Sequence, residues 1–126
     1  MKKINIPLMD IRPAYKHVDD IQEFLYLNQH NNKYENLFIN NWLDVLTLRP
    51  DTFHNTSWCF YDEGNLVGWL FIETIRPTNV LNISNFCVID IKYTVGIFRK
   101  SIELIKARVT KRTPKVTFQT MGGFLC

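Results

Sequence analysis

The 126-residue chain lacks the features of several protein classes. No apolar run approaches the roughly 18 to 20 residues that a membrane-spanning helix needs. Pro7 and Asp10 interrupt the N-terminus before the apolar core of a signal peptide develops. There are no internal repeats and no Gly/Ser linkers. We therefore expect one domain over residues 1–126, located in the cytoplasm and without a membrane partner.

Cysteine and histidine are also scarce, and their spacing does not suit a metal. The three cysteines form no CxxC pair, and the three histidines form neither an HxxxH nor an HxH pair. Structural zinc sites are usually built from such closely spaced pairs. The sequence therefore predicts no metal site.

Apolar residues, in contrast, are plentiful. The chain is 46% hydrophobic and 13% aromatic, with only 21% charged residues, which is enough apolar surface for a core and excludes a disordered chain. The net charge of +3 is unevenly distributed. Residues 92–115 carry eight basic side chains against Glu103 alone, a net +7, which leaves −4 for the remainder. Such a segment can face phosphate, nucleic acid or an acidic partner, or form a solvated helix face.

Helical spacing of apolar residues appears in three places. We expect a first helix over residues 19–27 that begins with two carboxylates, and a second over 37–49 that ends before Pro50. A third helix runs towards Pro114. Its expected buried stripe has apolar residues at helical intervals: Phe98, Ile102, Ile105 and Val109.

Strand patterns occupy the remaining segments. Residues 4–13 predict a short first strand, and residues 57–75 predict a hairpin whose turn contains Gly64 and Asn65, which tolerate positive φ. Residues 80–90 are apolar enough for a central strand. Residues 115–121 favour a last strand over a helical turn.

The order of these elements resembles the GCN5-related N-acetyltransferase (GNAT) fold over about residues 4–109. The stretch IRPAYKHVDDIQEF is similar to the family's opening, and WCFYDEGNLVGWLFI to its second and third strands. NFCVIDIKYTVGIFRKSIELIKA resembles the fourth strand, the acyl-CoA pyrophosphate loop and the third helix. Among family members, the chain looks most like the small acetyltransferase-like proteins of tailed bacteriophages. The implied fold class is α/β (α+β), a mixed, mostly antiparallel sheet flanked by helices and short of the family's last strands.

The resemblance implies an acyl-CoA-dependent N-acetyltransferase with acetyl-CoA as cofactor and an amine as acceptor. It places the pantetheine arm along the backbone of residues 86–89 and the phosphates near residues 93–98. The implied cofactor-binding residues are Phe86, Cys87, Val88, Ile89, Tyr93, Thr94, Val95, Gly96, Ile97, Phe98, Arg99 and Lys100. Glu73, at the end of a strand, is the candidate general base, because partial burial can raise the pKa of a carboxyl towards neutrality.

The chain departs from the family at two points. Phe98 stands where the family's second small residue lets the backbone approach phosphate, and no tyrosine follows Tyr93 to act as the acid. These departures favour a second hypothesis, a cofactor-free GNAT scaffold that binds a host or virion protein or dimerises through a strand edge. Nucleic-acid binding through the basic segment is a third hypothesis. The pI of about 8.8 is modest for that role.

Overall fold

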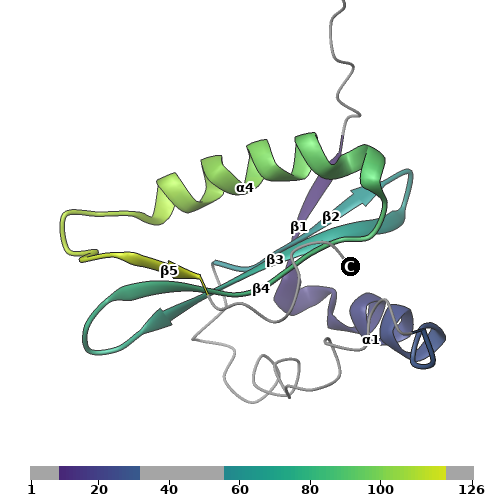
Figure 1. The fold of residues 1–126 in the computed structure, drawn as a ribbon, viewed down its shortest axis with the longest axis horizontal. Coiled ribbons are helices and arrows are strands. Elements are labelled where there is room, and N and C mark those ends of the chain that lie inside the picture. Colours follow the sequence, from purple (N-terminus) through teal and green to yellow (C-terminus); the bar gives the residue numbers. More distant parts are fainter. Residues whose placement is uncertain (1–8, 32–55, 119–126) are drawn as a thin grey trace, which may run out of the picture.

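A computed structural model describes residues 9–31 and 56–118 of the chain. These residues form one five-stranded sheet with the strands in sequence order, accompanied by two helices (Figure 1). The strands are β1 (Asp10–Pro13), β2 (Trp58–Asp62), β3 (Asn65–Ile75), β4 (Val80–Val88) and β5 (Val116–Phe118). The helices are α1 (Val18–Leu27) and α4 (Thr94–Arg108), each preceded by a 3₁₀ turn, η1 (Ala14–Lys16) and η3 (Ile91–Tyr93).

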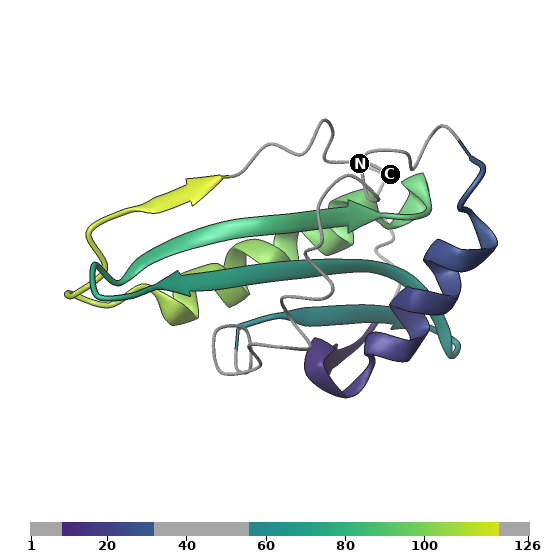
Figure 2. The ribbon, with the colours of Figure 1, turned by 90° about the horizontal axis from the view of Figure 1, so that it is seen from below.

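The sheet is mixed and mostly antiparallel, which confirms the expected fold class. β1 to β4 pair antiparallel in succession, whereas β5 runs parallel to β4 at the edge of the sheet (Figure 2). The parallel connection is made by α4, as parallel neighbours require a crossover. The register sets Val116 opposite Leu81 and Phe118 opposite Ile83.

The predicted strands and turns agree closely with the structure. The hairpin turns at Glu63 and Gly64, both with positive φ (50° and 81°), as the Gly64 signal indicates. A second turn, at residues 76–79, contains Asn79 in the left-handed region at φ 62°. The expected helix over residues 37–49 lies outside the described residues, as do residues 4–8 of the expected first strand and residues 119–121 of the expected last strand.

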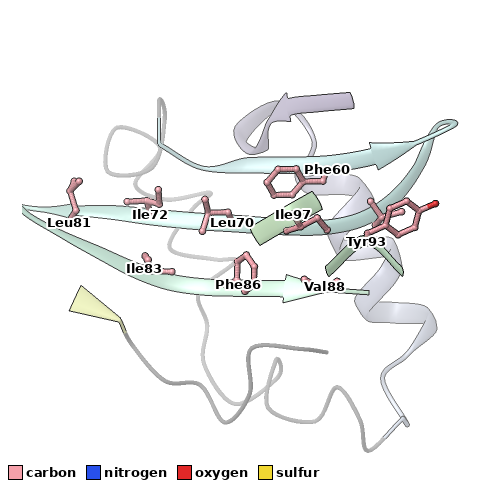
Figure 3. Close-up of a cluster of buried hydrophobic side chains, with 10 residues drawn as sticks. Phe60, Leu70, Ile72, Leu81, Ile83, Phe86, Val88, Tyr93 and Ile97 are labelled. Atoms are coloured by element: carbon pink, nitrogen blue, oxygen red, sulfur yellow. The ribbon is translucent and has the colours of Figure 1, made fainter. Parts of the chain in front are cut away.

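The two helices cover opposite faces of the sheet (Figure 1). The cluster on the α1 face contains Ala14, Ile21, Leu25, Cys59, Tyr61, Trp69, Phe71 and Cys87. The cluster on the α4 face contains Phe60, Val67, Leu70, Ile72, Leu81, Ile83, Phe86, Val88, Tyr93 and Ile97 (Figure 3). Alternate strand residues point to opposite faces, so the sheet separates the two clusters.

A polar contact also fastens α1 to the sheet. The Tyr61 hydroxyl, on β2, donates a hydrogen bond to the Asp20 carboxylate in the first turn of α1. His17 Nδ1, just before the helix, lies 3.5 Å from Asp20 Oδ2. The start of α1 is therefore fixed both by burial of Ile21 and by this carboxylate.

The face that α4 turns to the sheet differs from the predicted stripe. The buried helix residues are Gly96, Ile97 and Ser101. Of the predicted stripe, Ile105 packs against the cluster on the α4 face, while Phe98, Ile102 and Val109 are exposed. The prediction was wrong for these three residues because a helix rotates by about 100° per residue, so an apolar stripe one residue away presents a different side.

Gly68 on β3 explains the orientation that α4 adopts. A Cβ at this position would lie 2.6 Å from the carbonyl oxygen of Cys87 and 2.7 Å from Cδ1 of Ile97. Only glycine leaves room for Ile97 to reach the backbone of the sheet. The contact between Gly68 and Ile97 therefore determines which side of α4 is buried.

Candidate functional site

The connection from β4 to α4 is the candidate site. The chain leaves β4 at Val88, passes Asp90 and the short turn η3, and enters α4 at Thr94. The N-terminus of a helix at the carboxyl end of a strand is a common place for anions, because backbone N–H groups and the helix dipole point outwards there. Whether this connection offers such N–H groups depends on what they already bond.

Three consecutive amides at this connection have internal acceptors. The Lys92 amide donates to Oδ1 of Asp90 at 3.1 Å, and the Tyr93 amide donates to the Asp90 carbonyl oxygen at 3.0 Å. The Thr94 amide donates to the carbonyl oxygen of Ile91. Tyr93 has helical torsion angles (φ −93°, ψ −1°), so η3 leads directly into α4.

A second carboxylate lies at the same place. The Tyr93 hydroxyl donates a hydrogen bond to Asp62, at the end of β2, and this bond raises the pKa of Tyr93 above its ordinary value. The ammonium of Lys92 lies 5.0 Å from the centre of the Tyr93 ring. The first turn after β4 therefore combines one cation with the carboxylates of Asp62 and Asp90.

The predicted cofactor residues occupy two different settings. Phe86, Cys87 and Val88 are buried in β4, and the Ile89 amide donates to the Val67 carbonyl oxygen at 2.9 Å. Residues 94–100 are all helical and form the first two turns of α4. Phe98 does not point at the connection. Its ring packs against Phe86, with the ring centres 5.2 Å apart. Arg99 and Lys100 are exposed, and Lys100 pairs with Glu103 at 3.1 Å.

Glu73, the predicted general base, lies apart from these residues. It is half-buried on β3 opposite Asn82, six residues before Val88 along β4. At about 3.3 Å per residue, this separation amounts to roughly 20 Å along the strand. The structure therefore does not bring Glu73 together with residues 93–100.

Sequence reasoning missed several polar residues on or near β4. Asp90 follows an apolar strand and precedes a helix, a position where aspartate commonly caps the N-terminus of the helix. The sequence therefore contained a local signal for this residue. The buried pair of Trp69 and Asn85, with Nε1 donating to Oδ1 at 2.7 Å, had only a weak signal, an asparagine inside an apolar run.

The described residues contain no group of three or more His, Cys, Asp or Glu side chains that could hold a metal. Likewise, none of the helices in the described ranges is long and apolar enough to cross a membrane.

Known structures share this arrangement of strands and helices. The chain is similar to a ribosomal-protein-alanine N-acetyltransferase from Brucella melitensis biovar Abortus 2308, with a TM-score of 0.60, 15% identity and coverage of 90% of this chain and 80% of that one. It is also similar to a GNAT-family acetyltransferase from Staphylococcus aureus Mu50, with a TM-score of 0.55, 15% identity and coverage of 80% and 68%. The chain has the GNAT fold. No protein-family model matches the sequence, and no curated protein is significantly similar to it.

A third GNAT-like structure is AAC(6')-Iy in complex with the bisubstrate analogue CoA-S-monomethyl-acetylneamine. Its TM-score is 0.56 at 13% identity, and the match covers 90% of this chain and 80% of that one. At these identities, the similarity establishes the fold of the present chain. It does not establish which ligand, if any, the chain binds.

Three amides at the β4–α4 connection are not free to hold the diphosphate of CoA. In the GNAT family, as the sequence resemblance implies, bare backbone amides before the helix hold this group. Here the amides of Lys92, Tyr93 and Thr94 already have acceptors, and one of these acceptors is a carboxylate. A diphosphate would have to displace Asp90 and would lie beside the negative charges of Asp62 and Asp90.

Proposed function

We propose that this protein uses the GNAT scaffold without acyl-CoA and acts as a binding module for another protein. The observation that supports the proposal is the Asp90 carboxylate, which accepts the Lys92 amide directly before residues 93–98, where a GNAT enzyme would hold phosphate. The hydrogen bond from Tyr93 to Asp62 adds a second carboxylate to the same turn. A GNAT-fold protein with these contacts keeps the scaffold and lacks the amide cradle.

Calorimetric titration with acetyl-CoA and with CoA tests the proposal. We expect no binding up to high micromolar ligand, whereas AAC(6')-Iy under the same conditions serves as a positive control. Amide chemical shifts of Lys92, Tyr93 and Thr94 provide a second measurement and are expected to stay unchanged as acetyl-CoA is added. Saturable binding that shifts these amides would contradict the proposal.

Acyl transfer is the second candidate. Its support is the structural similarity to acetyltransferases, one of them in complex with a CoA-containing bisubstrate analogue. The roles that the sequence predicts belong to this candidate: acetyl-CoA as cofactor, an amine as acceptor, residues 86–100 as the binding segment and Glu73 as the base. The same titration distinguishes the two candidates, because this one requires acetyl-CoA to bind.

Other features stay predictions from the sequence. These are the similarity to tailed-phage proteins, the cytoplasmic location, a host or virion protein as partner, and homodimer formation through a strand edge. Nucleic-acid binding through the basic segment would use Tyr93, Phe98 and Phe118 as residues that stack on bases. The described surface does not favour it, since Phe98 packs against Phe86.

A further inference from the structure

Two buried polar atoms have no hydrogen-bond partner within the described part of the chain. They are Nε1 of Trp58, on β2, and Oγ of Ser101, on α4. Ser101 is only 4% exposed, and Trp58 is half-buried with its Nε1 atom closed off from solvent. By contrast, the buried polar groups of Trp69, Thr56 and Ser84 all donate to protein oxygens. Buried polar groups of folded proteins are nearly always hydrogen-bonded, so the two exceptions require a partner.

The strand register places Trp58 on the α4 face of the sheet. Phe60, two residues later on β2, belongs to the cluster on that face, and residues two apart in a strand point to the same side. Trp58 pairs with Leu70 of β3, which lies in the same cluster (Figure 3). The indole of Trp58 therefore extends into the layer between the sheet and α4, level with Leu70.

Ser101 reaches the same level from the helix. Cδ1 of Ile97 would lie 2.7 Å from a Cβ at Gly68, so Ile97 marks where α4 crosses that residue. The helix runs in the direction of β3, because it returns the chain from the end of β4 to the start of β5, and β5 is parallel to β4 while β3 is antiparallel to it. One helical turn from Ile97 to Ser101 advances about 6 Å. Two residues along β3, from Gly68 to Leu70, advance about 6.6 Å. Ser101 is therefore level with Leu70 and with its pairing partner Trp58.

The chemistry of the two groups determines what can bind between them. An indole N–H only donates a hydrogen bond, whereas a serine hydroxyl can donate or accept. The side chains around them, such as Leu70 and Ile97, are apolar, so a buried ion would lack a counter-charge. Water is neutral and small enough for a packed interior. It can accept from the indole and bond to the hydroxyl at the same time.

We propose that one internal water molecule is bound between α4 and the sheet, where it accepts a hydrogen bond from Nε1 of Trp58 and bonds to Oγ of Ser101. The water connects β2 to α4 across the apolar cluster, so the helix is held by a polar bridge as well as by its contact with Gly68. This inference goes beyond the proposed function and does not depend on it, because it uses no residue of the β4–α4 connection.

Oxygen-17 relaxation dispersion tests the proposal with the full chain, because it counts long-lived water molecules and is not affected by hydrogen exchange of hydroxyl groups. We expect Ser101→Ala to lower the count by one, since a single donor remains at the site. Alanine suits the interior of a helix, so this variant should fold like the wild type. Ser84→Ala is the matched control. Its hydroxyl is also buried but donates to the Phe71 carbonyl oxygen at 3.3 Å, so the count should not fall.

A high-resolution crystal structure of the wild type provides the second measurement. It should show one water molecule about 2.7 to 3.2 Å from both Nε1 of Trp58 and Oγ of Ser101. Trp58→Phe keeps an aromatic ring and removes the N–H, so the water should be absent from its structure. An unchanged count in Ser101→Ala would overturn the proposal. So would a direct hydrogen bond between Nε1 and Oγ, a Ser101 hydroxyl that donates to the Ile97 carbonyl oxygen instead, or a water that contacts only one of the two atoms.

Discussion

At the residue scale, Gly68 is where one missing side chain determines the position of a whole helix. Its Cα faces the Cys87 carbonyl oxygen and Cδ1 of Ile97, both too close for any Cβ. We predict that Gly68→Ala destabilises the protein by about 1 to 3 kcal/mol, because α4 must shift away from the sheet. Urea unfolding followed by circular dichroism measures the change.

Gly64 provides the control for this substitution. It also lies in the hairpin of β2 and β3, but a Cβ there would meet nothing within 4 Å, and its φ is +81°. Asparagine tolerates that backbone conformation, so Gly64→Asn should change the free energy of unfolding by less than about 0.5 kcal/mol. Equal losses for the two variants would show that flexibility, not close packing, explains Gly68.

The buried thiol of Cys59 leads to a prediction about alkaline pH. Burial, assisted by the nearby Asp20 carboxylate, raises the pKa of Cys59 from 9.0 to about 12. Above pH 9 the unfolded chain releases this proton while the folded protein keeps it, so unfolding becomes easier as pH rises towards 12. The loss is at most about 1.4 kcal/mol per pH unit, and the effect vanishes below pH 9.

Cys59→Ala removes the titrating group and should flatten this part of the pH profile. The measurement is the free energy of unfolding of both proteins between pH 7 and pH 10.5. Their difference is expected to be constant up to about pH 8.5 and then to shrink as the wild type loses stability. Parallel curves over the whole range would contradict the assignment of this effect to Cys59.

At the element scale, the start of α4 depends on Asp90. Its side chain accepts the Lys92 amide and so holds η3 in line with the helix. We predict that Asp90→Ala lowers the free energy of unfolding by about 1 kcal/mol, whereas Asp90→Asn, which keeps an acceptor oxygen, costs less than half of that. Thermal or urea unfolding of the two variants measures this. If both substitutions cost the same, the charge of Asp90 matters and the hydrogen bond does not.

The same elements show which parts of the fold can be predicted from sequence. The hairpin at Gly64 depends on local backbone chemistry, and the Asp90 cap depends on atoms two residues apart, so both have local signals. The side of α4 that is buried depends on Gly68, almost thirty residues earlier, and no periodicity within the helix contains that information. The sequence of α4 contains two apolar stripes, and its pattern alone does not show which of them packs against the sheet.

At the scale of the whole molecule, the candidate site was the hardest part to predict. The resemblance indicated the correct fold and the correct connection between β4 and α4. It could not indicate that Asp62, 31 residues before Tyr93, would accept a hydrogen bond from its hydroxyl. Such contacts are created by the sheet, which brings the ends of β2 and β4 to the same edge, on either side of β3. The scaffold is thus recognisable from sequence, while the chemistry of its site depends on distant pairs.

The sheet also separates the two buried clusters, so substitutions on opposite faces should affect stability independently. A double-mutant cycle can test this independence. Ile97 lies in the α4-side cluster and Ile21 in the α1-side cluster, and each alone should lose about 0.5 to 1.5 kcal/mol on substitution by valine. Ile97→Val removes the Cδ1 atom that an alanine at position 68 would meet, although the Cys87 carbonyl oxygen remains. We therefore predict that Gly68→Ala/Ile97→Val loses about 0.5 to 1 kcal/mol less than the sum of its single variants. Gly68→Ala/Ile21→Val, unfolded in urea under the same conditions, should be additive within about 0.5 kcal/mol, because Ile21 packs on the face of the sheet opposite to α4. Additivity in the first pair, or strong coupling in the second, would mean that α4 is not positioned by the contact between Gly68 and Ile97.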